Sequence, residues 1–234
     1  IQAGFFPEEL PKPTGWEIAA YFHAARQVAG DFYDAFCVAD CRYLVIVIAD
    51  VCNKGVGAAL FMGLFRSLLR AFADLHFPGG AEPAEGGDAG QRLHRVMMLT
   101  NNYIANMHGD ANMFATIFLG LVDPQNGEIV YINGGHDAPL ILNAAGIRCG
   151  LAPSGPAVGM FPDMPFEVER AQLQPQETLI LFTDGVTEAM NDDGELYTEE
   201  RLFRLLEANC PPPAASPQVS IRGSTPTATE RPRC

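Results

Sequence analysis

The stretch 43–60 places the strongest constraint on how this chain can fold. Its first part, Tyr43 to Ala49, is a continuous apolar run rich in β-branched residues, which is typical of a strand buried on both faces. The run ends on the carboxylate of Asp50, and a short segment with two glycines leads into an apolar helix that begins at about Val56. A carboxylate at the rim of a core has to be paired, hydrogen-bonded or bound to metal, because an uncompensated buried charge is costly.

Asp50 alone would be interpreted as a turn residue or a helix cap. Two further acids have similar settings: Asp31 follows a glycine, and Asp184 ends the apolar run 178–183 and precedes a glycine. Convergent carboxylates without matching Lys or Arg favour a hard divalent cation such as Mg²⁺ or Mn²⁺. We therefore rank a metal site at Asp31, Asp50 and Asp184 ahead of a purely structural role for these acids.

The net charge of −13 bears on the partners that the chain can bind. It argues against nucleic acid or an anionic membrane surface, and it suits a site that collects cations. No apolar run reaches the length of a membrane span and no signal peptide opens the sequence, so we expect reduced thiols and a cytoplasmic location. The sequence begins with Ile rather than Met, and we expect it to be part of a longer protein.

The order of the expected elements indicates an α+β fold. Strands are joined mostly by hairpins and two helices follow one another, which differs from a repeating βαβ pattern and favours antiparallel sheet. The expected strands are 16–25, 31–38, 42–49, 114–122, 128–133, 139–142, 166–173 and 178–183. The expected helices are 57–73, one capped by Asp88 that runs to about 107, and one capped by Thr198 that runs to about 207.

Four motifs carry a resemblance to a known family. They are Ala29-Gly30-Asp31-Phe32-Tyr33-Asp34, the run from Ala49 through Asp50-Val51-Cys52-Asn53-Lys54-Gly55 to Met62, Asn133-Gly134-Gly135-His136, and Phe182-Thr183-Asp184-Gly185-Val186-Thr187-Glu188-Ala189. The series resembles the motifs of SpoIIE-type protein serine phosphatases, the bacterial branch of the metal-dependent PPM phosphatase superfamily. Each motif is weak alone, whereas four in the family's order make a specific match over about residues 1–209.

The resemblance implies a layered sandwich in which two antiparallel sheets lie between helix pairs. It also implies two Mn²⁺ or Mg²⁺ ions that activate a water for direct attack on phosphorus, so that no Ser or Cys nucleophile is required. By this comparison Asp50 bridges the two metals, the backbone carbonyl of Val51 contributes an oxygen, and Asp184 binds the first metal. Asp31 would hold metal-bound water or the second metal.

Other motif residues allow more than one role. Lys54 would either contact phosphate, together with the backbone at Gly55 and the start of the following helix, or be a solvated lysine. His136 could act as a general acid, but a turn histidine that holds the backbone is the favoured interpretation. A structural role is also expected for three further residues: Asp34, Asn133 and Glu188.

Residues 210–234 differ in composition from the rest. They are rich in Pro, Ser, Thr and Arg, with only Val219 and Ile221 as large aliphatics, so we expect a disordered tail after a phosphatase domain at 1–209. The resemblance instead implies a helix and a strand with an Asp-Asp-hydrophobe-Thr motif whose first Asp binds metal. Because the sequence has no such motif, we expect the C-terminal strand to be missing, a sheet edge to be open and metal binding to be weak. A frameshifted or substituted C-terminus is one explanation.

Two functions follow from these observations. The first is metal-dependent hydrolysis of phosphoserine or phosphothreonine on a small signalling protein, which by the resemblance would be an anti-anti-sigma factor of the STAS type, with an upstream sensor or receiver domain. The second is a degenerate phosphatase fold that binds a phosphoprotein without turnover. The three retained acids favour the enzyme, and the missing final Asp favours the binding module. The oligomeric state, a dimer included, stays open.

Overall fold

Ten strands form two five-stranded sheets in the computed structural model, which describes residues 2–23, 28–80, 87–191, 193–208 and 218–223. The β3 sheet has the order β2-β3-β4-β5-β8 and is antiparallel throughout. Its strands are β2 (Phe32–Val38), β3 (Tyr43–Val51), β4 (Ala115–Val122), β5 (Glu128–Gly134) and β8 (Glu169–Gln172). The β9 sheet has the order β1-β10-β9-β6-β7. Its strands are β1 (Glu17–Phe22), β6 (Leu140–Asn143), β7 (Gly146–Gly150), β9 (Thr178–Phe182) and β10 (Gln218–Gly223).

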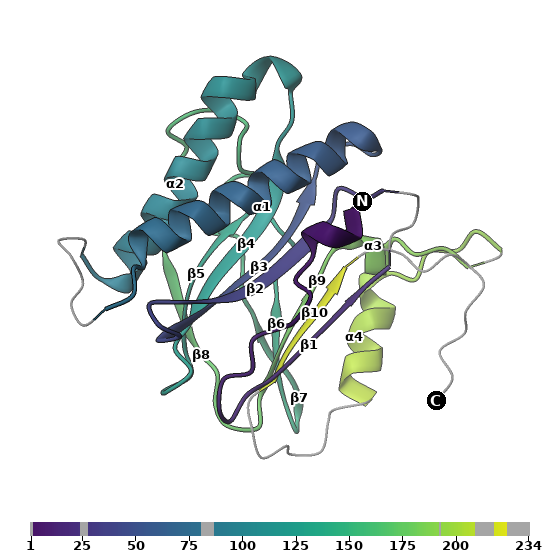
Figure 1. The fold of residues 1–234 in the computed structure, drawn as a ribbon. Helices are drawn as coiled ribbons and strands as arrows, with labels where there is room; N and C mark the ends of the chain where they lie inside the picture. The colour runs from purple at the N-terminus through teal and green to yellow at the C-terminus, as the bar shows by residue number, and fades with distance from the viewer. Residues whose placement is uncertain (1, 24–27, 81–86, 192, 209–217, 224–234) are drawn as a thin grey trace.

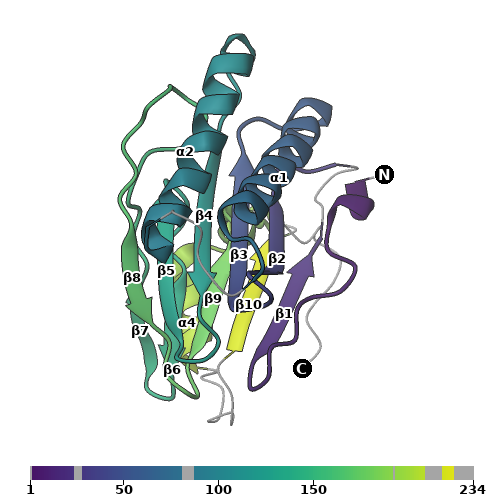
Figure 2. The same cartoon turned by 60° about the vertical axis from the view of Figure 1, so that its left-hand side comes forward.

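Helices cover the outer faces of the two sheets. α1 (Val56–His76) and α2 (Ala89–His108) lie across the β3 sheet, and α4 (Glu199–Ala208) lies beside the β9 sheet (Figure 1). Figure 2 shows α1 and α2 side by side on the same face of the sandwich. Three short helices complete the described chain: η1 (Gln2–Phe5), η2 (Gly109–Ala111) and α3 (Asp184–Thr187). The layering confirms the α+β class and the layered sandwich that the sequence predicts.

The residues of β3 alternate between two cores. The even-numbered residues from Leu44 to Ile48 belong to the core between the two sheets, and the odd-numbered residues from Val45 to Val51 belong to the core beneath α1 and α2. A third, smaller core lies between the β9 sheet and α4. Since both faces of β3 are buried, its sequence is apolar at every position from 44 to 49 instead of alternating with polar residues.

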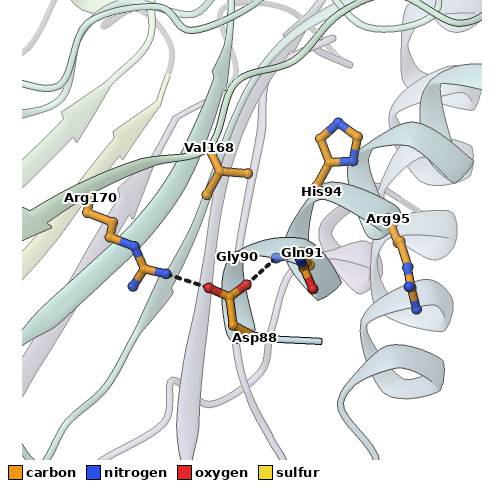
Figure 3. Close-up of a pocket in the computed structure, with 7 residues that line it drawn as sticks. All are labelled: Asp88, Gly90, Gln91, His94, Arg95, Val168 and Arg170. Carbon is orange, nitrogen blue, oxygen red and sulfur yellow. Dashed lines mark hydrogen bonds and ion pairs between the residues drawn. The ribbon is translucent and has the colours of Figure 1, made fainter. Parts of the chain in front are cut away.

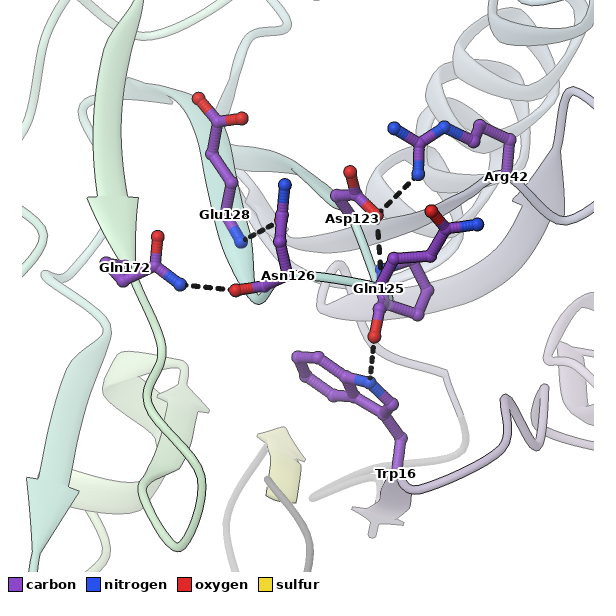
Figure 4. Close-up of polar contacts among 8 residues, drawn as sticks. Trp16, Arg42, Asp123, Gln125, Asn126, Glu128 and Gln172 are labelled. Atoms are coloured by element: carbon purple, nitrogen blue, oxygen red, sulfur yellow. Dashed lines mark hydrogen bonds and ion pairs between the residues drawn. The ribbon is translucent and has the colours of Figure 1, made fainter.

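The loop between β4 and β5 contains several of the polar contacts at one end of the sandwich (Figure 4). Asp123 accepts a hydrogen bond of 2.9 Å from the backbone of Gln125 and one of 2.8 Å from the guanidinium of Arg42. The indole of Trp16, just before β1, donates to the carbonyl oxygen of Pro124 at 2.9 Å. The predicted hairpin turn at 123–127 is therefore confirmed, and it also binds the start of the β9 sheet to the β3 sheet.

α1 is amphipathic and buries one face. The buried positions are Ala58, Met62, Gly63, Phe65, Leu69 and Ala73. Val56 and Leu60 are each 70% exposed, whereas the buried face packs on the β3 sheet and beside α2. By length and composition α1 could span a membrane, but in this domain its buried face packs on the β3 sheet.

The C-terminal segment differs from the prediction of a disordered tail. Residues 218–223 form β10, which lies between β1 and β9 and pairs with both in parallel. The expected disorder and missing strand are therefore wrong for these six residues, and β9 is not left with an open edge. Residues 209–217 and 224–234 lie outside the described residues, and the domain boundary at 209 stays a prediction.

The physical reason for this error is that strand formation depends on context. Val219 is 1% exposed and lies in the core between the sheets. One buried apolar side chain is enough to hold a strand in a central position, because the strands on both sides pair with its backbone. The two parallel pairings also make the β9 sheet mixed, where the resemblance implied an antiparallel one. β8 is shorter than the expected strand 166–173, and β7 was not expected.

Candidate metal centre

Three carboxylates meet at one end of the sandwich. Asp31, Asp50 and Asp184 each place one oxygen within 4.8 Å of the oxygens of the other two. These are the three acids singled out in the sequence, and the fold brings all of them together. Within the described ranges, no other group of three or more His, Cys, Asp or Glu side chains converges in this way.

Each carboxylate is placed by the end of a strand. Asp31 directly precedes β2, and Asp50 is the next-to-last residue of β3. Phe32 pairs with Ala49 in the antiparallel register, which brings Asp31 and Asp50 to the same end of the β3 sheet. Asp184 comes from the other sheet, since it follows β9 and opens α3. The cluster therefore exists only where the two sheets are packed together.

Gly30 allows the backbone to approach closely at this point. A Cβ atom at position 30 would lie 2.6 Å from the carbonyl oxygen of Val51, 3.3 Å from the Cβ of Ala58 and 3.4 Å from Oδ1 of Asp50. The Val51 carbonyl and the Asp50 carboxylate thus both border Gly30. A larger residue here would push the ends of β2 and β3 apart, and the need for glycine was not recognised from the sequence.

The turn after β3 leads directly to α1. Asn53 and Gly55 have positive φ angles of 70° and 93°, which asparagine tolerates and glycine adopts freely. A Cβ at position 55 would meet nothing within 4 Å, so the backbone conformation, rather than lack of space, favours glycine there. Lys54 lies between these two residues and is exposed, and its charge lowers the pKa of both Asp50 and Asp184.

The electrostatics of the cluster are those of carboxylates held together without enough positive charge. Burial, a hydrogen bond to the Asp31 carboxyl group and the charges of Asp31 and Asp184 raise the pKa of Asp50 to about 8. Burial and the neighbouring acids, Asp31 first among them, raise the pKa of Asp184 to about 6. The charge of Lys54 opposes both shifts but does not cancel them. Such a cluster favours either protons or a cation.

His136 has a structural position. Its Nδ1 lies 3.0 Å from the hydroxyl of Thr116, its Nε2 lies 3.1 Å from the carbonyl oxygen of Phe182, and the residue is 3% exposed. Burial lowers its pKa to about 4, so the ring is neutral near pH 7. Asn133 holds the turn by accepting the backbone N–H of His136 at 2.8 Å. The favoured interpretation of both residues is confirmed.

Asp34 is also structural, as expected. Its carboxylate is 1% exposed and accepts a hydrogen bond of 2.7 Å from Nη2 of Arg70. The guanidinium of Arg66 lies 3.0 Å from the same carboxylate. Both arginines belong to α1, so the ion pairs fasten this helix to β2. The charge of Glu188 contributes to the raised pKa of Asp184, and its structural role stays a prediction.

Thr183 is a site residue whose role its motif did not indicate. Its hydroxyl donates to Oδ2 of Asp31 at 2.7 Å, and the side chain is fully buried. Alternation along 178–183 could have indicated an inward side chain, but not which acid it would meet.

A separate recess of about 510 Å³ lies beside the N-terminus of α2 (Figure 3). Its lining residues are Asp88, Gly90, Gln91, His94, Arg95, Val168 and Arg170. Asp88 caps α2 by accepting the N–H of Gln91 at 2.8 Å, as predicted, and also pairs with Arg170 at 2.9 Å. Arg170 lies opposite Val130 in the β5–β8 pairing, at the end of the β3 sheet away from Asp50, so the recess is distinct from the metal centre.

Comparison with known proteins identifies the family. The family described as Stage II sporulation protein E (SpoIIE) matches residues 40–229. The chain belongs to the SpoIIE family. This confirms the resemblance drawn from the four motifs, and the matched range extends through β10.

Two curated proteins illustrate how this SpoIIE-family chain compares with relatives. Protein IcfG of Synechocystis sp. is 47% identical over 221 residues, which cover 89% of this chain and 35% of that protein. Phosphoserine phosphatase RsbU of Bacillus subtilis is 26% identical over 209 residues, which cover 88% of this chain and 57% of RsbU. The chain thus spans about a third to just over half of the length of these relatives.

Solved structures agree with the fold. The RsbU and RsbW domains of Rv1364c from Mycobacterium tuberculosis match with a TM-score of 0.55 at 26% identity, covering 75% of this chain and 44% of that one. The SiaA-PP2C domain of Pseudomonas aeruginosa matches with a TM-score of 0.59 at 18% identity, covering 79% of this chain and 68% of that one. At that identity the second match shows only that the two chains share a fold.

Proposed function

We propose that this SpoIIE-family domain is a metal-dependent protein serine/threonine phosphatase. The observation that carries the proposal is the convergence of Asp31, Asp50 and Asp184 from two sheets onto one point. The family relatives RsbU and RsbP of Bacillus subtilis are phosphoserine phosphatases, which supports the same reaction class here.

The residues present fit a hard divalent ion. The donors are carboxylate oxygens with the Val51 carbonyl oxygen beside Gly30, and oxygen is the ligand that Mg²⁺ and Mn²⁺ prefer. Burial is the main cause of the raised pKa values of Asp50 and Asp184, and repulsion between the acids adds to it despite the charge of Lys54. A cation would relieve this repulsion.

In the proposed site, each acid has a separate task. Asp50 would be shared between two ions of Mn²⁺ or Mg²⁺, Asp184 would bind the first, and Asp31 would bind the second or a water attached to it. The carbonyl of Val51 would add an oxygen ligand. When bound, the ions supply Lewis-acid activation of water and neutralise charge on the phosphoryl group.

The segment after Asp50 would receive the phosphate. Lys54 is exposed next to the carboxylates and could pair with a phosphoryl oxygen. The first turn of α1 follows Gly55, and the backbone N–H groups of a helix's first turn have no intrahelical acceptor. The first turn of α1 also contains no acidic residue, so it would not repel an anion.

The proposed substrate is a small phosphorylated regulatory protein, such as an anti-anti-sigma factor of the STAS type. The support is family membership together with the relatives RsbU and RsbP, whose lengths exceed the matched region. We also propose a cytoplasmic location and an upstream sensor or receiver domain in the full-length protein. The negative net charge argues against nucleic acid as a partner.

A non-catalytic phosphoprotein-binding domain is the second candidate. It is favoured by one observation at the C-terminal strand, where the family resemblance implies a metal-binding Asp. β10 occupies a central place in its sheet but carries no acidic residue.

A phosphate-release assay separates the two candidates. A phosphoserine protein of the STAS type would be incubated with the domain in Mn²⁺ and, separately, in excess chelator. Release that requires Mn²⁺ supports the phosphatase. Binding of the phosphoprotein without release would support the binding domain, and equal release in chelator would contradict the metal-dependent mechanism.

A further inference from the structure

The metal centre draws its acids from two sheets, and two hydrogen-bonded links join these sheets beside it. We propose that Thr183 and His136 are positioning residues, whose contacts hold Asp31, Asp50 and Asp184 at coordinating distance before a metal binds. The inference rests on the proposed function, because it assumes that the cluster binds metal.

The first link acts directly on an acid. The hydroxyl of Thr183 donates to Oδ2 of Asp31 at 2.7 Å, and Thr183 is fully buried while Asp31 is 8% exposed. This contact limits rotation of the Asp31 carboxyl group. Thr183 also directly precedes Asp184, so one hydrogen bond fixes the distance between the chain segments that carry two of the three acids.

The second link passes through the imidazole of His136. A carbonyl oxygen can only accept, so Nε2 carries the proton and donates to the oxygen of Phe182, and Nδ1 accepts from the hydroxyl of Thr116. Thr116 pairs with Asp50 across β3 and β4, and Phe182 lies two residues before Asp184. His136 therefore connects the strand beside Asp50 to the strand that leads into Asp184.

These links oppose a specific force. In the ionised form that a metal requires, three carboxylates within 4.8 Å repel one another, and the repulsion would separate the two sheet ends at this point. Side chains that orient metal ligands from outside the coordination sphere affect metal affinity about 10- to 100-fold in known sites. A residue that only packs the core would change stability without this effect on affinity.

The test removes single hydroxyl groups with little change of shape. Thr183→Val and Thr116→Val each delete one donor, Thr183→Ser and Thr116→Ser keep it, and Thr100→Val is the matched control. Thr100 is a fully buried threonine of α2, and its hydroxyl donates to the carbonyl oxygen of Val96 in the same helix at 2.8 Å. The measurements are Mn²⁺ affinity by titration calorimetry and the Tm of the metal-free proteins.

The expected result is a separation of affinity from stability. Thr183→Val and Thr116→Val should weaken Mn²⁺ binding by about tenfold or more, whereas the serine variants should stay within about threefold of wild type. Thr100→Val should lower Tm and leave Mn²⁺ affinity unchanged. Unchanged affinity in both Thr183→Val and Thr116→Val would overturn the inference.

A second readout keeps the inference apart from the proposed function. If the wild-type protein binds no Mn²⁺, the proposed function fails, and hydrogen exchange of the metal-free proteins then decides the inference. The backbone N–H groups of Val186 and Glu188 bond to the carbonyl oxygens of Thr183 and Asp184. Faster exchange at these two amides in both valine variants supports the positioning role, and unchanged exchange contradicts it.

Discussion

Thr183 Oγ1 donates a hydrogen bond of 2.7 Å to Asp31 Oδ2, across 152 positions of sequence and from one sheet to the other. The bond shows that the candidate metal centre is a property of the packed sandwich and not of any single motif. Substitutions in different elements should therefore affect the same centre, each through a different physical cause.

Asp50→Asn should abolish Mn²⁺ binding and phosphatase activity without unfolding the domain. The pKa of Asp50 is about 8 in the metal-free protein, so its carboxyl is mostly neutral at pH 7 and the neutral amide should leave the metal-free Tm nearly unchanged. Thermal denaturation with and without saturating Mn²⁺ measures both effects. As a contrast, Asp34→Asn leaves Arg66 and Arg70 without their buried partner and should cost about 3 kcal/mol in either condition. A large fall in the metal-free Tm of Asp50→Asn would instead identify Asp50 as structural.

The metal-free protein should lose stability as the pH rises from about 6.5 to about 8. The pKa of Asp50 is about 8 in the folded state and about 3.9 in an unfolded chain, so the folded state binds the proton more tightly and rising pH favours unfolding. His136, with its pKa lowered to about 4, acts in the opposite direction below about pH 6.5, where the unfolded state takes up the proton. Chemical denaturation in chelator across this range is the measurement. Saturating Mn²⁺ should remove the trend, and a flat profile in chelator would contradict it.

Gly30→Ala should weaken Mn²⁺ binding and destabilise the fold by about 1–3 kcal/mol, the range for overpacking a close contact. The new Cβ would lie 2.6 Å from the Val51 carbonyl oxygen, a distance that requires the backbone to move. Gly109→Ala is the matched control, because a Cβ there meets nothing within 4 Å and the residue has helical φ and ψ angles. Titration calorimetry and denaturation of both variants test this, and equal behaviour of the two would refute the tight contact.

Lys54→Ala should raise KM for a phosphoprotein substrate by about two- to fivefold, the size expected for an exposed ion pair, and should leave Tm nearly unchanged. Lys54 is exposed beside Asp50 and Asp184, so its loss removes a charge and little packing. Lys12→Ala is the control. Lys12 is exposed and precedes β1, which starts at the end of the β9 sheet away from Asp184. Steady-state kinetics that show the same KM for both variants would rule out phosphate contact by Lys54.

Val219→Asp should destabilise the domain by about 3 kcal/mol or more, because it buries an unpaired charge between the two sheets. Ser220 follows it and is half-buried, so Ser220→Asp should be much milder. Chemical denaturation compares the two. Similar stability for both variants would mean that residues 218–223 do not occupy the centre of the β9 sheet.

Most of the β3 sheet could be predicted from the sequence, because its information is local. The hairpin loop at 123–127 and the apolar run of β3 are both contained in short segments, and Asp31, Asp50 and Asp184 each stand at a strand end that the pattern marks. β10 could not be predicted in this way. Its partners, β1 and β9, are distant in sequence, and its composition gives little indication of a strand until those partners surround it.

The hydrogen bonds around the metal centre also could not be predicted from local sequence patterns. The motif around His136 predicts a histidine that holds the backbone, but nothing near it in the sequence indicates that Thr116 and Phe182 are its partners. The short motif around Thr183 likewise does not tell whether its hydroxyl faces solvent or the core. Which acid it meets depends on how the two sheets pack, and sequence spacing does not specify that packing.

The pairing of β1 with β10 sets an order for folding during synthesis. β2 to β5 can pair while the ribosome is still working, since each partner follows its neighbour along the chain. β1 emerges before them, yet among the described strands its one neighbour is β10, so it has no partner until residues 218–223 leave the exit tunnel. A chain released early would expose the free edges of both β1 and β9, the kind of surface on which chaperones and aggregation act. Emergence of residues 218–223 is thus the step that closes this sheet.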